Sequence, residues 1–192
     1  MHRTTRVVAV AVFLAALWAL FQFSGLKAHF SLQAIHDGFE QNMVAGLLVF
    51  AALFALGNLA QIPGWLFLVA AVLALGRVWG GLATYLAACL SCVISLAVIR
   101  ALGGDALRRL PGKWMALVLA RLDAHPTRSV LALRLVFQTA PAVNVALALS
   151  GVPWRPYLLG TLLGLPLPVL LCTVCFVTVA SSLHWPLPAG GA

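Results

Sequence analysis

The chain has 192 residues, 63% of them hydrophobic and 8% charged, and its mean hydropathy is +1.05. A soluble domain of this length does not need so much apolar surface, so the composition excludes the soluble classes and indicates one integral membrane domain. Twelve Lys and Arg stand against four Asp and Glu, a net charge of +8. Because the basic residues cluster beside apolar segments, we expect anionic lipid headgroups as partners, and not nucleic acid.

The N-terminal region, residues 1–42, is predicted to hold one transmembrane helix and an outer connector. Its apolar run, residues 7–23, is longer than the hydrophobic core of a usual signal peptide, and no small-residue cleavage site follows it. We therefore expect an uncleaved helix. Arg3 and Arg6 precede this helix, and the positive-inside rule then places the N-terminus in the cytoplasm.

Residues 43–76 are predicted to form a broken hairpin, because a turn signal containing Pro63 and Gly64 interrupts apolar sequence. The apolar run after this turn, residues 65–76, is well short of the roughly 20 residues that a full crossing needs. Pro63 and Gly64 are therefore assigned to the hairpin tip. Arg77 follows the hairpin, and two roles are considered for it, headgroup binding and anchoring at the membrane interface.

The next apolar segment, residues 79–99, is long enough for a full crossing. It leads into a basic stretch, residues 100–128, which the positive-inside rule places in the cytoplasm. Within that stretch, residues 105–125 are too charged to span, yet apolar residues recur there at helical spacing, with an interruption at Pro111 and Gly112. We predict an amphipathic helix on the inner membrane face; a linker packed on the protein is the alternative.

The segment 129–152 is apolar, yet it carries a charge and a backbone break. Arg134 at membrane depth costs about 2.5 to 3.5 kcal/mol on insertion scales, so it should face a cavity, a partner or a substrate path. The break at Pro141 persists only where protein or water satisfies the freed backbone groups. We predict a second re-entrant hairpin with Pro141 at its tip. The candidate substrate-binding residues are the polar ones of this hairpin and one from the first: Arg134, Gln138, Thr139, Asn144 and Arg77.

These polar residues also have a structural interpretation. Arg134 would bond carbonyl groups freed by the break, or extend to the cytoplasmic face. Gln138, Thr139 and Asn144 would either line a hydrophilic groove or cap the two half-helices, and the two roles are compatible. The half-helices that follow each tip would present N–H groups and a partial positive charge to an anion.

The last apolar segment, residues 157–180, is predicted to cross the membrane and to leave a tail, residues 183–192, outside. Hairpin plus helix then occurs twice with opposite orientation, the arrangement of inverted-repeat transporters. The expected fold is an all-α polytopic membrane protein with two inverted repeats, whose membrane domain covers residues 43–182. Three full crossings in place of the first hairpin and its helix give the same charge parity, so both topologies stay open.

Small residues recur at helical spacing in the predicted helices. Two pairs of glycines predict close helix packing: Gly76 with Gly80, and Gly160 with Gly164. The four cysteines form two CxxC pairs in apolar sequence: Cys89 with Cys92, and Cys172 with Cys175. Because no His or acid accompanies these cysteines, we expect them to pack helices and to bind no metal. We find no catalytic constellation and expect neither an enzyme nor a cofactor.

A series of motifs in residues 58–179 resembles the DedA superfamily, in its branch of SNARE-associated Golgi proteins with a VTT domain. No single motif is specific, but their order and spacing together are. They are Ile62-Pro63-Gly64, Gly76 with Gly80-Gly81, Arg100 to Asp105, Leu133-Arg134-Leu135, Pro141, Asn144-x6-Gly151 and the run from Trp154 to Pro166.

The resemblance implies two opposed re-entrant hairpins and a protein that translocates or scrambles lipids, with some relatives depending on a proton gradient. Two features depart from the family pattern. The family usually has acidic residues in the first hairpin, one directly after Pro-Gly, where this chain has Trp65; residues 43–76 contain no Asp or Glu. A second arginine common in the family corresponds to Ala140. Proton coupling through carboxylates and binding by an arginine pair are therefore not expected here.

The function we expect is passive or weakly coupled movement of a phospholipid or polyprenyl-phosphate carrier between leaflets, along a groove between the two tips. The alternatives are an ion-coupled small-solute transporter and a non-transporting membrane scaffold. A composition rich in Ala, Leu, Val and Arg favours the inner (plasma) membrane of a bacterium. The oligomeric state is left open.

Overall fold

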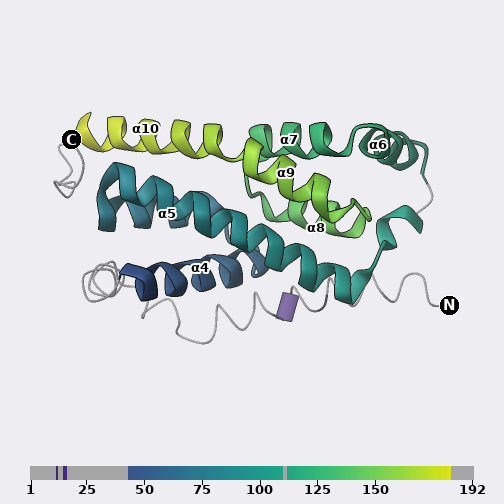
Figure 1. Ribbon diagram of the computed structural model, residues 1–192, viewed down its shortest axis with the longest axis horizontal. Helices are drawn as coiled ribbons and strands as arrows, with labels where there is room; N and C mark the ends of the chain where they lie inside the picture. The colour runs from purple at the N-terminus through teal and green to yellow at the C-terminus, as the bar shows by residue number, and fades with distance from the viewer. Residues whose placement is uncertain (1–11, 13–14, 17–42, 110–111, 183–192) are drawn as a thin grey trace.

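The computed structural model describes residues 12, 15–16, 43–109 and 112–182 (Figure 1). Over these residues every regular element is helical, in agreement with the predicted all-α class. Two helices are long and apolar enough to cross a membrane, Gly64–Gly103 and Trp154–Ser182. The predicted tail and, apart from three residues, the predicted first helix and connector lie outside the described residues.

The first hairpin consists of α4 (Met43–Leu59) and the start of α5 (Gly64–Gly103). The helix α5 is not one straight rod, because Gly76 has φ 78° and ψ 177°, and the chain reverses there. A Cβ at Gly80 would lie 2.6 Å from the Ala71 carbonyl oxygen, so the two parts of α5 are in backbone contact. The close packing predicted for this glycine spacing is confirmed.

The part of α5 after the reversal, residues 77–103, is about 40 Å long at 1.5 Å per residue. It is followed by a short 3₁₀ helix, η1 (Ala106–Arg109), and by α6 (Lys113–Ala124). The expected interruption between these two elements is present. The expected single apolar face of this region is wrong, because Leu117 and Val118 are more than half exposed while other apolar side chains of α6 are buried.

The second hairpin consists of α7 (Pro126–Phe137) and α8 (Pro141–Leu149). Each helix begins at a proline, whose missing N–H costs nothing in a first turn. The chain ends with α9 (Trp154–Gly164) and α10 (Pro166–Ser182). The last crossing, predicted as one helix, is therefore two helices that meet at Leu165, because Pro166 cannot donate a backbone hydrogen bond.

The long part of α5 contacts α4 along one side and α8 and α10 along others, while α7 packs on α9 (Figure 1). A Cβ at Gly160 would lie 2.7 Å from the Cβ of Val130, and one at Gly164 would lie 2.6 Å from the Cβ of Arg134. The second predicted glycine pair therefore also allows close helix packing. The two halves of the protein each use a glycine pair to bring backbones together.

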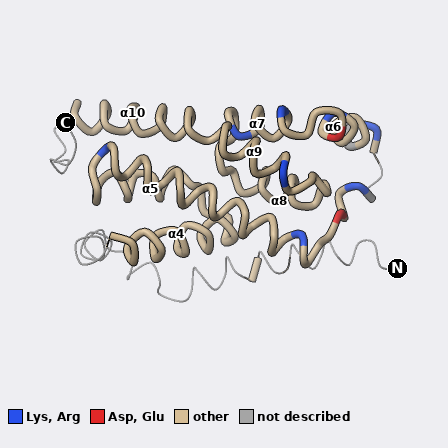
Figure 2. Tube along the Cα trace, viewed as in Figure 1, with Lys and Arg blue, Asp and Glu red and all other residues tan. Residues whose placement is uncertain are grey.

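Charge is distributed unevenly along the molecule. Figure 2 shows Lys and Arg gathered at the end that holds α6 and the C-terminal end of α5, while α4 and α10 carry no charged residue. Large apolar side chains cover the outer surface of the helices, with Leu163 of α9 at 63% and Leu170 of α10 at 59% exposure. Such a surface is suited to lipid, which solvates apolar side chains.

Candidate functional site

The turn of the first hairpin follows the C-terminal end of α4. Gln61 takes a positive φ of 63°, its N–H donates to the Asn58 carbonyl (3.2 Å), and the Ile62 N–H donates to the Gly57 carbonyl (2.8 Å). These two bonds are those of a Schellman motif, in which the residue of positive φ is usually glycine. Backbone groups of the chain thus satisfy the carbonyls at the end of α4 before Pro63 leads into α5.

The turn of the second hairpin has a different backbone geometry. Gln138 has φ 51° and ψ −121°, and the Ala140 N–H donates to the Phe137 carbonyl (2.9 Å). This is a type II′ turn, which favours glycine at the position that Gln138 occupies. Among the described residues, Gln61 and Gln138 are the two residues other than glycine with positive φ. Each hairpin therefore has one glutamine in a conformation that L-residues rarely adopt.

The two turns meet in the interior of the molecule. A Cβ added to Gly64 would overlap the Oγ1 atom of Thr139, so the turns approach more closely here than any side chain larger than hydrogen would allow. Pro63 and Gly64 thus lie in the first turn, and Pro141 begins α8 directly after the second. The structure places these three predicted tip residues at the ends of helices that converge.

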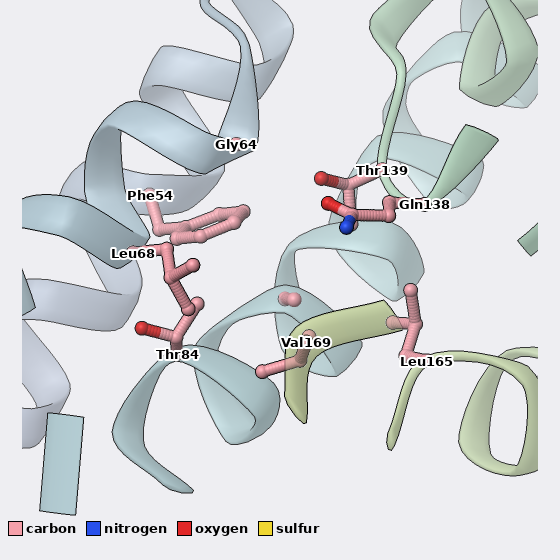
Figure 3. A pocket seen from close by; sticks show the side chains of 9 residues that line it. Phe54, Gly64, Leu68, Thr84, Gln138, Thr139, Leu165 and Val169 are labelled. Atoms are coloured by element: carbon pink, nitrogen blue, oxygen red, sulfur yellow. The ribbon is translucent and has the colours of Figure 1, made fainter. Parts of the chain in front are cut away.

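A small cavity lies beside this contact (Figure 3). The space in it that is open to a water molecule is about 10 Å³, which is room for roughly one water. Polar side chains from both halves of the protein, Thr84, Gln138 and Thr139, share its wall with apolar ones. Nine residues line it: Phe54, Gly64, Leu68, Thr84, Ala88, Gln138, Thr139, Leu165 and Val169.

Arg134 does not line this cavity; its side chain is fully buried behind the second turn. One Nη1 hydrogen goes to the Gln138 carbonyl (3.0 Å) and the other to Asn144 Oδ1 (2.6 Å). Nη2 donates to the Tyr157 hydroxyl (2.7 Å), and Nε donates to Thr161 Oγ1 (3.3 Å). All four partners are neutral oxygen atoms, so Arg134 holds the turn through hydrogen bonds, which burial strengthens.

Asn144 connects the two hairpins. Its Nδ2 donates to Asn58 Oδ1 at the end of α4 (3.0 Å) and to the Thr139 carbonyl (3.3 Å). Asn58 in turn donates to the hydroxyls of Ser91 (2.9 Å) and Ser95 (3.4 Å) on α5. Over the described residues, every buried side-chain nitrogen and oxygen has a hydrogen-bond partner. The polar network is therefore fully satisfied in this conformation.

The structure thus divides the predicted site residues into three groups. Gln138 and Thr139 line the cavity, Arg134 and Asn144 form the network behind it, and Arg77 is exposed at the reversal of α5. That reversal lies at the far end of the molecule from α6 (Figure 1). Arg77 is therefore not brought together with the other four, and direct substrate binding by any of the five stays a prediction.

Sequence reasoning missed the side chains that complete the site: Asn58, Thr84, Tyr157 and Thr161. A buried asparagine in an apolar helix does signal that a partner is needed. Tyrosine and threonine are common at helix ends and in helix interiors, and their presence alone gives no such signal. Tyr157 nevertheless joins two helices, because its hydroxyl donates to the Cys92 carbonyl (3.0 Å) and its ring lies 5.3 Å from the Arg134 guanidinium carbon.

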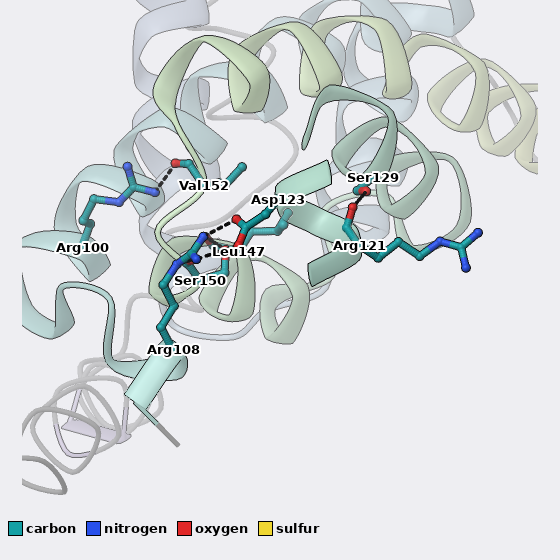
Figure 4. Close-up of polar contacts among 8 residues, drawn as sticks. All are labelled: Arg100, Arg108, Arg121, Asp123, Ser129, Leu147, Ser150 and Val152. Carbon is teal, nitrogen blue, oxygen red and sulfur yellow. Dashed lines mark hydrogen bonds and ion pairs between the residues drawn. The ribbon is translucent and has the colours of Figure 1, made fainter. Parts of the chain in front are cut away.

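Two further arginines hold the C-terminal end of α8 (Figure 4). Arg100 Nη2 donates to the Val152 carbonyl (2.6 Å), and Arg108 Nε donates to the Ser150 carbonyl. Arg108 also forms a two-bond ion pair with Asp123 of α6. These bonds hold the pKa of the Asp123 carboxyl below its ordinary value, so this side chain is ionised at neutral pH. Cations placed here also favour the negative end of the α8 dipole.

The four cysteines are free thiols, and in the part of the chain that the structure describes no three metal-ligating side chains come together. Cys92 is buried beside Asn144, and Cys172 accepts a hydrogen bond from the Gln138 amide (2.8 Å). At least two of the cysteines therefore contact the polar groups of the second hairpin. Their predicted role in helix packing agrees with the burial of Cys92 in the apolar core.

A protein-family model, that of the VTT domain, matches residues 62–178. The matched region begins at the first turn and ends within α10, so it contains both turns, the cavity and the polar network. No curated protein and no solved structure matches the chain.

Proposed function

We propose that this chain, which belongs to the VTT domain family of SNARE-associated Golgi proteins in the DedA superfamily, moves lipids between the leaflets of a membrane. The observation that carries the proposal is the meeting of two broken-helix turns at a cavity with polar walls, inside a protein whose outer surface is apolar. Broken backbone and polar side chains at membrane depth are costly, and they are retained where they serve a polar path.

The proposed placement makes both hairpins re-entrant. The first would enter from the outer face and the second from the cytoplasmic face, so that Gly64 and Thr139 meet near the middle of the bilayer. Residues 77–103 and the pair α9–α10 would cross completely. The charge distribution supports this placement, since the basic end with α6 then lies in the cytoplasm. The N-terminus would also be cytoplasmic, and the membrane would be the inner membrane of a bacterium.

The cavity has room for about one water, so the described conformation is closed to a headgroup. Passage requires the two turns to separate, which widens the cavity between Thr84 on one side and Gln138 with Thr139 on the other. The polar walls would then lower the cost of a headgroup at mid-membrane, while the acyl chains stay in lipid. Separation would also expose Arg134 donors to the lipid phosphate, which a guanidinium binds well.

The test is scrambling of a fluorescent phospholipid in proteoliposomes, with Thr84→Val and Thr139→Val together. Valine keeps the volume and removes the hydroxyls from the cavity wall, and we expect scrambling to fall roughly tenfold. Thr173→Val is the matched control: like Thr84, Thr173 is buried and donates to the carbonyl four residues earlier, but it does not line the cavity.

Each outcome of this experiment decides something. Loss of scrambling in the double variant, with Thr173→Val unaffected, supports the route past the cavity. Equal loss in both assigns the effect to helix packing and removes the cavity from the route. Wild-type rates no higher than those of empty liposomes overturn lipid movement, and flux of soluble solutes would then be measured for the transporter alternative.

A further inference from the structure

The exposed face of α6 combines apolar and basic side chains. Leu117 is 62% and Val118 is 61% exposed, while Leu122 on the other side of the helix is buried at 5%. Lys113, Leu117 and Arg121 are spaced four residues apart, so they form one row along the helix. Both cations of this row are exposed. The helix therefore buries one apolar side within the protein and presents a second, which is flanked by positive charge.

This face needs a partner that is both apolar and negatively charged. The acid of α6, Asp123, is paired with Arg108 and does not neutralise Lys113 or Arg121. The headgroup layer of an anionic leaflet supplies both properties, since apolar side chains enter the acyl boundary and cations bind the lipid phosphates. The helix is too short and too charged to cross the bilayer, and it lies at the basic end of the molecule (Figure 2).

The ion pair joins α6 to the second hairpin. Arg108 binds Asp123 with two hydrogen bonds and, through Nε, the carbonyl of Ser150 directly after α8. One side chain thus connects the helix with the exposed basic face to the hairpin that carries Gln138 and Thr139. A change in the position of α6 acts on α8 through this side chain.

We propose that α6 docks on the anionic headgroups of one leaflet, and that Arg108 transmits this docking to the C-terminal end of α8. The contact makes the order of the second hairpin depend on the lipid charge of that leaflet. This inference goes beyond lipid movement, because docking requires only that the protein is in a membrane. A soluble acidic protein and a second copy of the chain are the competing partners for the same face.

The experiment is amide hydrogen exchange on the full chain in nanodiscs, either of pure phosphatidylcholine or of phosphatidylcholine mixed equally with phosphatidylglycerol. We expect α6 to exchange on the order of tenfold more slowly in the mixture, from two cations near a charged surface. The difference should shrink in high salt. Lys113→Gln with Arg121→Gln should abolish it, and Lys113→Arg with Arg121→Lys, which keeps both charges, should retain it.

A second variant tests the link to α8. Asp123→Ala removes the ion pair and leaves the row of cations, so slower exchange in the mixture should persist in α6 and disappear from α8. Ser129→Ala is the control, because it removes a different contact of α6, the bond from the Ser129 hydroxyl to the Arg121 carbonyl (3.3 Å). It should leave the response of both helices intact.

Three results would overturn the proposal. Equal exchange of α6 in the two lipids means that the face does not bind anionic headgroups. Protection that rises with the ratio of protein to lipid assigns the face to a second copy. A response of α8 that survives Asp123→Ala removes Arg108 from the link. Because none of these readouts measures lipid movement, their failure is distinct from failure of the proposed function.

Discussion

The two hairpin turns solve the same problem by different means. Each breaks a helix inside apolar surroundings and places a glutamine at positive φ. The first turn is closed by its own backbone in a Schellman motif and packs beside a cluster of phenylalanine rings. The second leaves the Gln138 carbonyl to the buried guanidinium of Arg134. The first turn therefore depends on local geometry, and the second depends on a side chain that also binds α8 and α9.

This difference predicts unequal tolerance of substitution. A turn closed by backbone bonds survives changes of distant side chains, whereas a turn held by a network fails when the central member is lost. The cavity wall draws its two amide and hydroxyl side chains from the second turn and its glycine from the first. The second turn is thus the part of the site where structure and polar function are most closely combined.

The largest expected effect comes from Arg134→Ala. The substitution leaves the Gln138 carbonyl, Asn144 and the Tyr157 hydroxyl without their donor, at about 1 to 3 kcal/mol for each buried group. Release from burying a charge offsets part of this, so the expected net loss is about 3 kcal/mol. Thermal unfolding in detergent measures it. Arg155→Ala, at an exposed arginine of α9, is the control and should leave the melting temperature unchanged.

A smaller effect tests the packing of the first half. Gly80→Ala would place a Cβ 2.6 Å from the Ala71 carbonyl oxygen and force the two parts of α5 apart, at a cost of about 1 to 3 kcal/mol. The adjacent Gly81→Ala is the control, since its Cβ meets only Thr173, at 3.4 Å, and alanine favours the helix. Equal melting temperatures of the two variants would show that the reversal at Gly76 is looser than described.

The bond between the hairpins is tested by a double-mutant cycle on Asn58 and Asn144. Each single change to alanine removes several hydrogen bonds, but the coupling between the two changes reports their shared bond (3.0 Å). We expect a coupling of about 1 kcal/mol in chemical unfolding. A coupling near zero would mean that the two turns are held together by packing alone, with the contact of Gly64 and Thr139 as the main term.

Several of these elements are predictable from the sequence, because their causes are local. Pro63, Gly64 and Pro141 mark both turns through backbone chemistry that needs no tertiary information. The pairing of Asn58 with Asn144 is not predictable in this way, since a polar residue in an apolar helix shows only that a partner exists. The exposure of Leu117 was missed for another reason: helical spacing identifies a face, but an apolar face turned to lipid is as stable as one turned to protein.

The smallest effect separates the two glutamines. Gln61→Gly relieves a positive φ that costs an L-residue about 1 to 2 kcal/mol, while the flexible unfolded chain cancels about 0.4 to 1 kcal/mol of that gain. We expect a net stabilisation of roughly 0.5 kcal/mol, read as a small rise in melting temperature. Gln138→Gly relieves similar strain but loses the bonds from its amide to the Pro168 carbonyl (3.2 Å) and to Cys172, so it should not stabilise. Equal rises in both variants would contradict the view that the second turn depends on its side chains, because they would show that only backbone strain distinguishes either glutamine from glycine.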